Sequence, residues 1–382
     1  MGPMPEPQAF VEMFAALPDP RVHRTRLHSL ETILFLCLCA VVCGANDPVA
    51  IERFGKARKD FLAKFVDVRG GIPSHDTIGR VLAKLNPDAL EAMFARWMAA
   101  VARATDQDVV AIDGKTLRRA VDKARSGAFV HMVSAWSTAN GVVLGQVAVD
   151  EHSNEITAIP RLLSLLQVKN CLVTIDAIGC QTEIVDAIVD AGGDYLISVK
   201  DNQPKLNEAI LAAFDEALHD GRWPKGTHVK SEEAAHGRTE LRQCWILDAG
   251  KLASILPEAS KWKKLAKLVY VQRECTTGGK TSSGMRLFIT SRASLTAAEA
   301  LASVRSHWQI ENKVHWTLDV AFREDESRLR AENATENLAV VRHVALNLLR
   351  GVKGSKVGIK NRRLEAGWNE DFLMKVLASH EN

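Results

Sequence analysis

Two aspartates each follow a short run of apolar residues that is typical of a buried β-strand. Residues 109–112 lead to Asp113, and residues 171–175 lead to Asp176. In an open α/β sheet, ligands bind at the carboxyl ends of the parallel strands. Two carboxylates there repel each other unless a cation neutralises them, and Mg²⁺ prefers oxygen ligands. The pattern therefore indicates a magnesium site, although an aspartate after a strand is also a common turn former or helix cap.

A third carboxylate, Glu311, lies in a segment rich in histidine and tryptophan. Spacings of three and four residues put His307, Glu311 and His315 on one face of a predicted helix, in line with Val304. A glutamate on a helix usually faces solvent, but two histidines and two tryptophans are unusual neighbours for such a residue. The two histidines also leave a zinc site open as an alternative. We favour magnesium because the two aspartates supply the remaining ligands.

Apolar patterns predict the elements that must carry these carboxylates. Strands are predicted at residues 108–113, 131–137, 142–149, 171–176, 194–200, 240–247, 268–274 and 285–290. Helices are predicted at residues 155–166, 181–191 and 206–218. A capping-box pattern at Thr296 and Glu299 opens a long helical stretch that ends near residue 350. A hairpin followed by alternating helices and strands indicates an α/β fold with a mixed sheet flanked by helices.

The order of these elements divides the chain into five expected parts. Residues 1–105 are expected to form a helical N-terminal domain, either a DNA-binding head or a plain packing domain. Residues 106–225 begin the α/β core, residues 226–292 form a β-rich insertion, and residues 293–350 supply the remaining core helices. Residues 351–382 are expected to form a basic C-terminal tail.

The composition is that of an ordinary globular protein, with 47% hydrophobic and 25% charged residues. The net charge is only +3, so any affinity for nucleic acid must come from local basic patches. The seven cysteines lie mostly in apolar runs, and we expect them to be reduced and buried, as in a cytoplasmic protein. The apolar run at residues 32–45 is too short to span a bilayer, so we expect no membrane partner.

Several segments, taken together and in order, resemble the ISAs1-type transposases, also called H-repeat-associated proteins, which are related to the IS4 transposases. The resemblance covers residues 12–377. The segments that carry it are GIPSHDTIGRV (71–81), AIDGKTLR (111–118), NEITAIP (154–160), TIDAIGCQT (174–182), GDYLISVKDNQ (193–203), HGRTE (236–240), HWQIENKVHW (307–316), FREDESR (322–328) and RHVALNLL (342–349).

This resemblance implies an RNase H-like fold in which Asp113, Asp176 and Glu311 bind two Mg²⁺ or Mn²⁺ ions. It implies a β-rich insertion between the second aspartate and the glutamate, which 134 residues separate here. The implied activity is cleavage at transposon ends followed by strand transfer. The implied partners are the terminal inverted repeats and target DNA, bound by a homodimer in the bacterial cytoplasm at the nucleoid. Many IS4-related enzymes have Tyr, Arg and Lys where this chain has Val304, His307 and Leu318.

Because of that departure, the residues that contact phosphate or DNA must be sought more widely. The candidates are basic or amide side chains near the carboxylates, in the insertion and in the basic run at residues 351–363: Lys115, Asn202, Gln203, Arg238, Arg305, His307, Lys313, His315, Lys360, Arg362 and Arg363. A second basic run lies at residues 21–28. Each candidate has an alternative role, because polar loops, ion-paired turns and solvated basic faces are common.

Three other functions remain open at this point. The first is a nuclease of the same fold that cuts DNA without integrating it. The second is a catalytically silent DNA-binding regulator or relic. The third is a phosphohydrolase that does not act on nucleic acid, which would not retain DNA at physiological salt.

Overall fold

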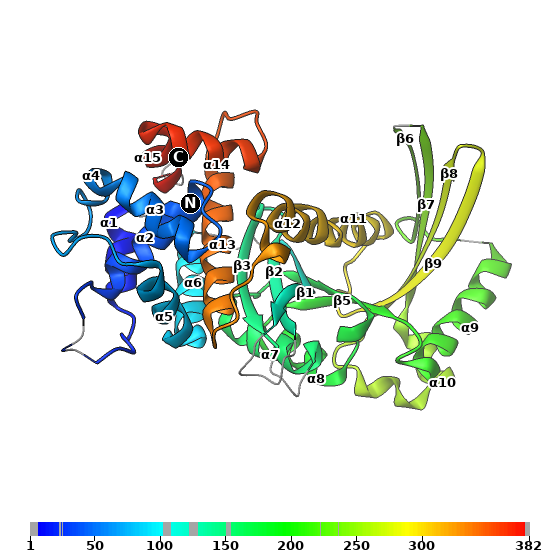
Figure 1. Ribbon diagram of the computed structural model, residues 1–382. Coiled ribbons are helices and arrows are strands. Elements are labelled where there is room, and N and C mark those ends of the chain that lie inside the picture. Colours follow the sequence, from blue (N-terminus) through cyan, green and yellow to red (C-terminus); the bar gives the residue numbers. More distant parts are fainter. Residues whose placement is uncertain are drawn as a thin grey trace.

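The computed structural model describes residues 7–22, 24, 26–101, 108–121, 129–149, 154–221, 223–235 and 237–378. A group of helices lies at one end of the molecule, a mixed sheet lies in the middle, and two long hairpins project at the other end (Figure 1). None of the helices in the described part of the chain is both long and apolar enough to cross a membrane.

The N-terminal part is helical, as the sequence predicts. Its helices are α1 (Pro7–Ala15), α2 (Leu30–Val42), α3 (Pro48–Ala57), α4 (Lys59–Leu62), α5 (His75–Lys84) and α6 (Pro87–Val101). Side chains of Ser29, Asp47 and Ser74 cap the first turns of α2, α3 and α5. Nearly all of α2 is buried, including Cys37 and Cys39, so its long apolar run is a core helix that other helices surround.

A nine-stranded sheet forms the middle and the far end of the molecule, in the order β3-β2-β1-β4-β5-β9-β8-β7-β6. Its strands are β1 (Val109–Val121), β2 (Phe129–Ser137), β3 (Val142–Ala148), β4 (Leu172–Ile175), β5 (Asp194–Val199), β6 (His228–Ala235), β7 (Arg238–Asp248), β8 (Lys267–Thr277) and β9 (Lys280–Thr290). Strands β1 to β3 are antiparallel, and β1, β4 and β5 are parallel. An antiparallel hairpin joined to parallel strands in the order 3-2-1-4-5 is the RNase H-like sheet that the resemblance implies.

Helices cover both faces of this sheet. On one face, α7 (Glu155–Leu165) packs on β2 and β3, and α8 (Thr182–Asp190) packs on β5. On the other face, α11 (Ala297–His307) packs on β1, β4 and β7, and α12 (Trp316–Phe322) continues towards the N-terminal helices (Figure 1). The capping box at Thr296 and Glu299 that the sequence predicts opens α11.

Helix α13 (Ala334–Gly351) joins the sheet to the helical part of the molecule. It is buried from Ala334 to Leu349 and packs on α2, α5 and α6. The amide of Asn347 forms two hydrogen bonds with the backbone of Val143, donating to its carbonyl over 2.8 Å and accepting from its N–H over 2.9 Å. These bonds satisfy backbone groups of the edge strand β3, which would otherwise be unpaired and buried.

The expected basic tail contains two further helices, α14 (Ile359–Trp368) and α15 (Glu370–Leu377), which pack on α13. Their residues Ala366, Leu373 and Val376 share one hydrophobic core with α2 and α13. The domain boundaries expected from the sequence stay predictions.

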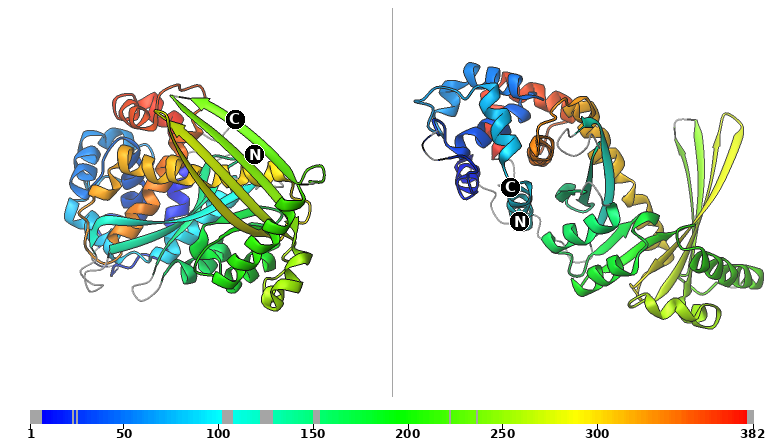
Figure 2. Two further views of the ribbon diagram at one scale, coloured as in Figure 1. Left: turned by 90° about the vertical axis from the view of Figure 1, so that its right-hand side faces the viewer. Right: turned by 60° about the horizontal axis from the view of Figure 1, so that its bottom comes forward.

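The β-rich insertion consists of two long hairpins, β6–β7 and β8–β9, which extend well beyond the core strands (Figure 2). The helices α9 (Pro204–Asp220) and α10 (Leu252–Ile255) accompany them. Only the last residues of β9, from Leu287, pair with β5, so residues 280–286 continue past the core sheet. Strand β6 is not among the predicted strands because most of its side chains are exposed and polar, and its pairing with β7 stabilises it.

Candidate active site

The two aspartates lie on neighbouring strands because of the parallel register of β1 and β4. Ile112 pairs with Ile175, so the next residues along the two strands, Asp113 and Asp176, are neighbours about one strand spacing, ~4.8 Å, apart at the backbone. Asp176 directly follows β4 and caps the next turn by accepting a hydrogen bond from the N–H of Ile178 over 3.1 Å. Strand β1 differs from the prediction, because it continues past Asp113 by pairing with β2.

Glu311 lies on a π-helical turn, Ile310–His315, between α11 and α12. Ile310 and Val314 are fully buried on the core side of this turn, which leaves Glu311 exposed on the opposite side. A pattern of 3.6 residues does not predict this wider turn, which is rare and is often found at functional sites. Asp113, Asp176 and Glu311 all line one cavity of about 180 Å³.

Opposed effects set the pKa values of these carboxyls. Burial and the charges of Glu155 and Asp113 raise the pKa of Asp176, and burial and the charge of Asp113 raise that of Glu311. Burial also acts to raise the pKa of Asp113, but His315 and the charge of His307 outweigh it, so this pKa is lowered. The charge of Asp113 therefore opposes the ionisation of both Asp176 and Glu311, which is an electrostatic effect that a bound cation relieves.

His315 lies close to one of the two aspartates, and His307 lies close to the strand that precedes the other. Nε2 of His315 lies 3.3 Å from Oδ2 of Asp113, and Nδ1 of His307 lies 3.0 Å from the hydroxyl of Thr174. Burial lowers the pKa of His307, although the charge of Asp113 acts against this effect. Among the residues that the structure describes, no three His, Cys, Asp or Glu side chains are close enough to hold a metal ion together.

Two basic residues that line the cavity were not among the sequence-based candidates. Lys200 directly follows β5 at the same sheet edge as the aspartates, and Arg286 comes from β9 of the insertion. The guanidinium of Arg286 lies 4.9 Å from the ring centroid of Trp308, so the insertion contacts the segment that carries Glu311. Lys200 could have been found from its position after the strand, whereas nothing in the sequence indicates that Arg286 returns to this edge.

Lys115, a predicted phosphate contact, forms ion pairs within the chain. Its ammonium lies 2.5 Å from Asp319 of α12 and 3.0 Å from Glu324. Glu324 is buried and its second oxygen lies 3.7 Å from the guanidinium of the buried Arg342. Burial acts to lower the pKa of Lys115, but the two carboxylates outweigh it and raise this pKa. Lys115 therefore connects β1, two residues after Asp113, to the helix that follows Glu311.

Asn202 and Gln203 support the loop that follows Asp176. The amide of Asn202 donates to the carbonyl of Ala177 over 2.6 Å, and the amide of Gln203 donates to that of Cys180 over 2.9 Å. Their donor groups thus hold the loop in place instead of pointing to a phosphate.

Most of the basic side chains that are predicted to contact DNA form ion pairs or hydrogen bonds within the chain. Arg238 pairs with the buried Glu240 over 2.6 Å, and Arg305 makes a two-point ion pair with Glu233 of β6. Arg362 donates to the carbonyls of Leu349 and Ser355, each over 2.7 Å.

Arg363, a predicted DNA contact, is buried among backbone carbonyls. It donates to the carbonyls of Val41 and Ala45, and its guanidinium lies 4.1 Å from the ring centroid of Phe322. Lys313 and Lys360, in contrast, are exposed.

Comparisons with known proteins show the family to which the chain belongs. Residues 104–348 match the family model described as "Transposase DDE domain", and residues 11–98 match the model described as "DDE_Tnp_1-associated". The chain is 40% identical over 379 residues to "Putative transposase YncI" of Escherichia coli O157:H7, covering 97% of this chain and 95% of that protein. It is 38% identical over 376 residues to "H repeat-associated putative transposase YhhI" of Escherichia coli (strain K12), covering 98% of each.

Among solved structures, a piggyBac transposase synaptic complex with hairpin DNA matches at a TM-score of 0.41 and 12% identity, covering 98% of this chain and 81% of that one.

Proposed function

Because the chain belongs to the DDE transposases, we propose that it cleaves phosphodiester bonds at the ends of a mobile DNA element and joins those ends to target DNA. The observation that supports this most is the convergence of Asp113, Asp176 and Glu311 on one cavity from two strands and a π-helical turn. A shared cavity is what an acid triad needs in order to act on one phosphate.

The donor set of this cavity suits divalent cations. The three carboxylates supply hard oxygen ligands, which Mg²⁺ and Mn²⁺ prefer over nitrogen or sulfur. A cation would also offset the charge of Asp113, which opposes ionisation of the other two acids. Asp113, Asp176 and Glu311 would together hold two such ions, each ion with fewer than three of these side chains, because no three of them lie close enough among the described residues to bind one ion. When bound, the ions would supply most of the positive charge that stabilises the transition state of phosphoryl transfer.

The other cavity residues would bind and orient the DNA strand. Lys200 and Arg286 place two cations at the rim of the cavity, where they would neutralise phosphate oxygens. His307, held by Thr174 and with a lowered pKa, would act as a neutral hydrogen-bond partner near pH 7. His315 lies on the same π-helical turn as Glu311. Through its contact with Asp113 it would keep that carboxylate in a fixed orientation.

The proposal includes two copies of the chain that hold two element ends together in the bacterial cytoplasm. A second candidate is a nuclease that cuts without joining, because the same triad serves both reactions. A catalytically silent regulator is disfavoured by the complete set of three acids at the cavity. A phosphohydrolase of small substrates is disfavoured by the family to which the chain belongs.

The deciding experiment incubates the protein with duplex DNA that carries the ends of its source element, with Mg²⁺ or Mn²⁺ and with a supercoiled target. A cut mapped to the element boundary, followed by end-joined product, supports transposition. A mapped cut without joined product supports the nuclease. Hydrolysis of a phosphomonoester without any DNA cleavage would overturn the proposal. A duplex with scrambled ends serves as the control.

A further inference from the structure

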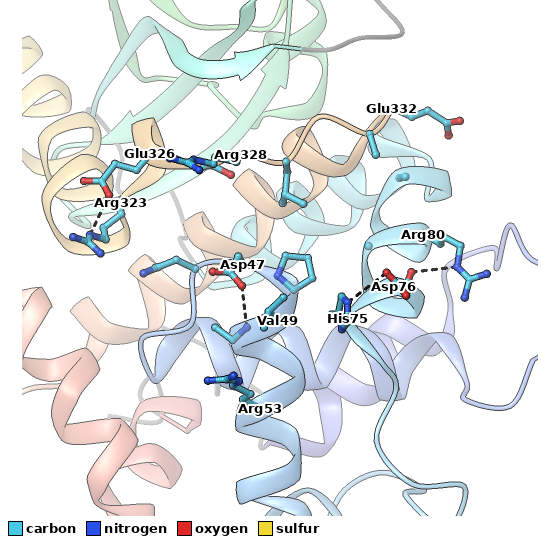
Figure 3. A pocket seen from close by; sticks show the side chains of 18 of the residues that line it. Asp47, Val49, Arg53, His75, Asp76, Arg80, Arg323, Glu326, Arg328 and Glu332 are labelled. Carbon is cyan, nitrogen blue, oxygen red and sulfur yellow. Dashed lines mark hydrogen bonds and ion pairs between the residues drawn. The ribbon is translucent and has the colours of Figure 1, made fainter.

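A second hollow, of about 1060 Å³, lies between the N-terminal helices and the segment that follows α12 (Figure 3). It is lined by α3 with the preceding turn, by α5 and by a loop between Arg323 and Glu332. In Figure 3, Arg323, Glu326 and Arg328 lie on one side of it, and Arg53, His75 and Arg80 lie on the other. It shares no described lining residue with the cavity of the three carboxylates.

Two of the segments that resemble the family meet in this hollow. Residues 71–81 contribute His75, Asp76, Gly79 and Arg80, and residues 322–328 contribute Arg323, Glu326, Ser327 and Arg328. Most of these side chains are exposed, so the packing of the core does not account for them. The active-site cavity does not use them either.

Basic side chains slightly outnumber acidic ones in the lining of the hollow, which has Arg53, Arg80, Lys84, Arg323 and Arg328 against Asp47, Asp76, Glu326 and Glu332. Arg53, Lys84 and Arg328 line it with exposed side chains for which the described part of the chain offers no hydrogen-bond or ion-pair partner. Most of the acids are engaged, because Glu326 pairs with Arg323 over 3.4 Å, and Asp47 caps α3 through the N–H of Ala50 over 2.9 Å. Asp76 lies 3.5 Å from His75, so Glu332 is the acid of the lining without such a contact among the described residues.

On α5, the lining of the hollow includes a residue without a side chain, Gly79. A side-chain carbon added at Gly79 would meet no atom of the described residues within 4 Å, and the backbone there has an ordinary helical conformation. Glycine inside a helix costs about 1 kcal/mol relative to alanine. Packing among the described residues therefore does not require Gly79, and its missing side chain leaves the helix backbone accessible from the hollow.

We propose that this hollow binds the sugar–phosphate backbone of the DNA duplex that leads into the active site. This inference rests on the proposed function, in which DNA is the substrate. Exposed arginines and lysines without partners are the groups that neutralise phosphates, and a glycine surface admits the backbone closely. The hollow is also fixed relative to the carboxylates, since Glu324, in the loop that bounds it, pairs with Lys115 on the strand of Asp113.

The test measures binding of the full chain to a labelled duplex over a range of salt concentrations without divalent metal. The triple variant Arg53→Gln/Lys84→Gln/Arg328→Gln removes three cations of the lining that have no partner in the described part of the chain. Each phosphate contact contributes about 0.9 to the slope of log K against log salt, so this slope should decrease by up to about 3. Affinity should fall equally for element ends and for unrelated duplex, because phosphate contacts carry no sequence information.

The control removes three exposed lysines outside both cavities, Lys59→Gln/Lys169→Gln/Lys375→Gln, and should leave the slope within about 1 of the wild-type slope. Gly79→Leu should weaken DNA binding at least tenfold without lowering Tm, since its side chain enters open space. Failure of the wild-type chain to bind any duplex would overturn the proposed function. An unchanged slope for the triple variant of a chain that does bind DNA would overturn only the assignment of this hollow.

Discussion

Replacing Lys115 by methionine tests whether its ion pairs, and not DNA, account for its charge. The side chain is 11% exposed, and Glu324, its partner at 3.0 Å, is 2% exposed. In Lys115→Met, the remaining cation near Glu324 in the described structure is Arg342 at 3.7 Å. Removing one partner of a buried ion pair typically costs about 3–5 kcal/mol. We therefore expect the free energy of unfolding at pH 7 to fall by roughly 3 kcal/mol.

The sign of the pH dependence follows from Glu324. Burial acts to raise its pKa, but the charges of Lys115, Arg342 and His343 outweigh it, so the pKa in the folded state lies below the ordinary value of 4.5. A depressed carboxyl pKa gives stability that is present above the unfolded-state value and is lost as the pH falls. The cost of Lys115→Met should therefore be largest above about pH 5 and should shrink in acid.

Urea unfolding measures the coupling between Lys115 and Glu324 directly. It compares Lys115→Met, Glu324→Gln and the double variant Lys115→Met/Glu324→Gln with the wild-type chain. The double variant should be more stable than the sum of the single losses predicts, by about 1–3 kcal/mol. DNA binding by folded Lys115→Met should keep its wild-type salt dependence. Additive losses of unfolding free energy in the double variant would refute the ion-pair role. So would a loss below about 1 kcal/mol in Lys115→Met together with a decreased salt dependence of DNA binding, which would restore Lys115 as a phosphate contact.

Three further outcomes are expected. Arg363→Met should lower the free energy of unfolding by about 2–4 kcal/mol, because the carbonyls of Val41 and Ala45 lose a buried donor, and thermal unfolding checks this. His343 is buried, and its pKa is lowered to about 4. The free energy of unfolding should therefore fall by up to about 1.4 kcal/mol per pH unit as the pH drops from 6.5 towards 4. In urea titrations, His343→Gln should make this pH dependence less steep. Added Mg²⁺ should raise Tm of the wild-type chain but not of Asp176→Asn, whereas equal shifts would place the ions elsewhere.

The sheet and the two aspartates could be predicted because they depend on local patterns. Short apolar runs that end in aspartate gave the strands, and parallel pairing then required Asp113 and Asp176 to be neighbours. The length of β1 was underestimated, since it depends on antiparallel pairing with β2 and not on its own side chains. The π-helical turn at Glu311 also escaped prediction, because a standard helical period was assumed there.

The basic side chains were the least predictable part. A run such as residues 351–363 contains the charges but not their partners, which lie far away in the sequence. Arg363 meets the carbonyl of Val41, and Lys115 meets Asp319, only after the chain has folded. Conversely, Arg53, Lys84 and Arg328, which have no partner among the described residues, are scattered in the sequence, so no charge run indicates the hollow that they share.

The central claim is that Asp113, Asp176 and Glu311 form one metal-dependent site for cutting DNA. The most direct measurement is single-turnover cleavage of an end-containing duplex by Asp113→Ala, Asp176→Ala and Glu311→Ala in Mg²⁺, with binding of the same duplex measured in parallel. Glu208→Ala, an exposed acid of α9, serves as the control. Each triad variant should lose cleavage while it still binds DNA, and the control should cut like the wild-type chain. Substantial Mg²⁺-dependent cleavage by Asp176→Ala would contradict the claim.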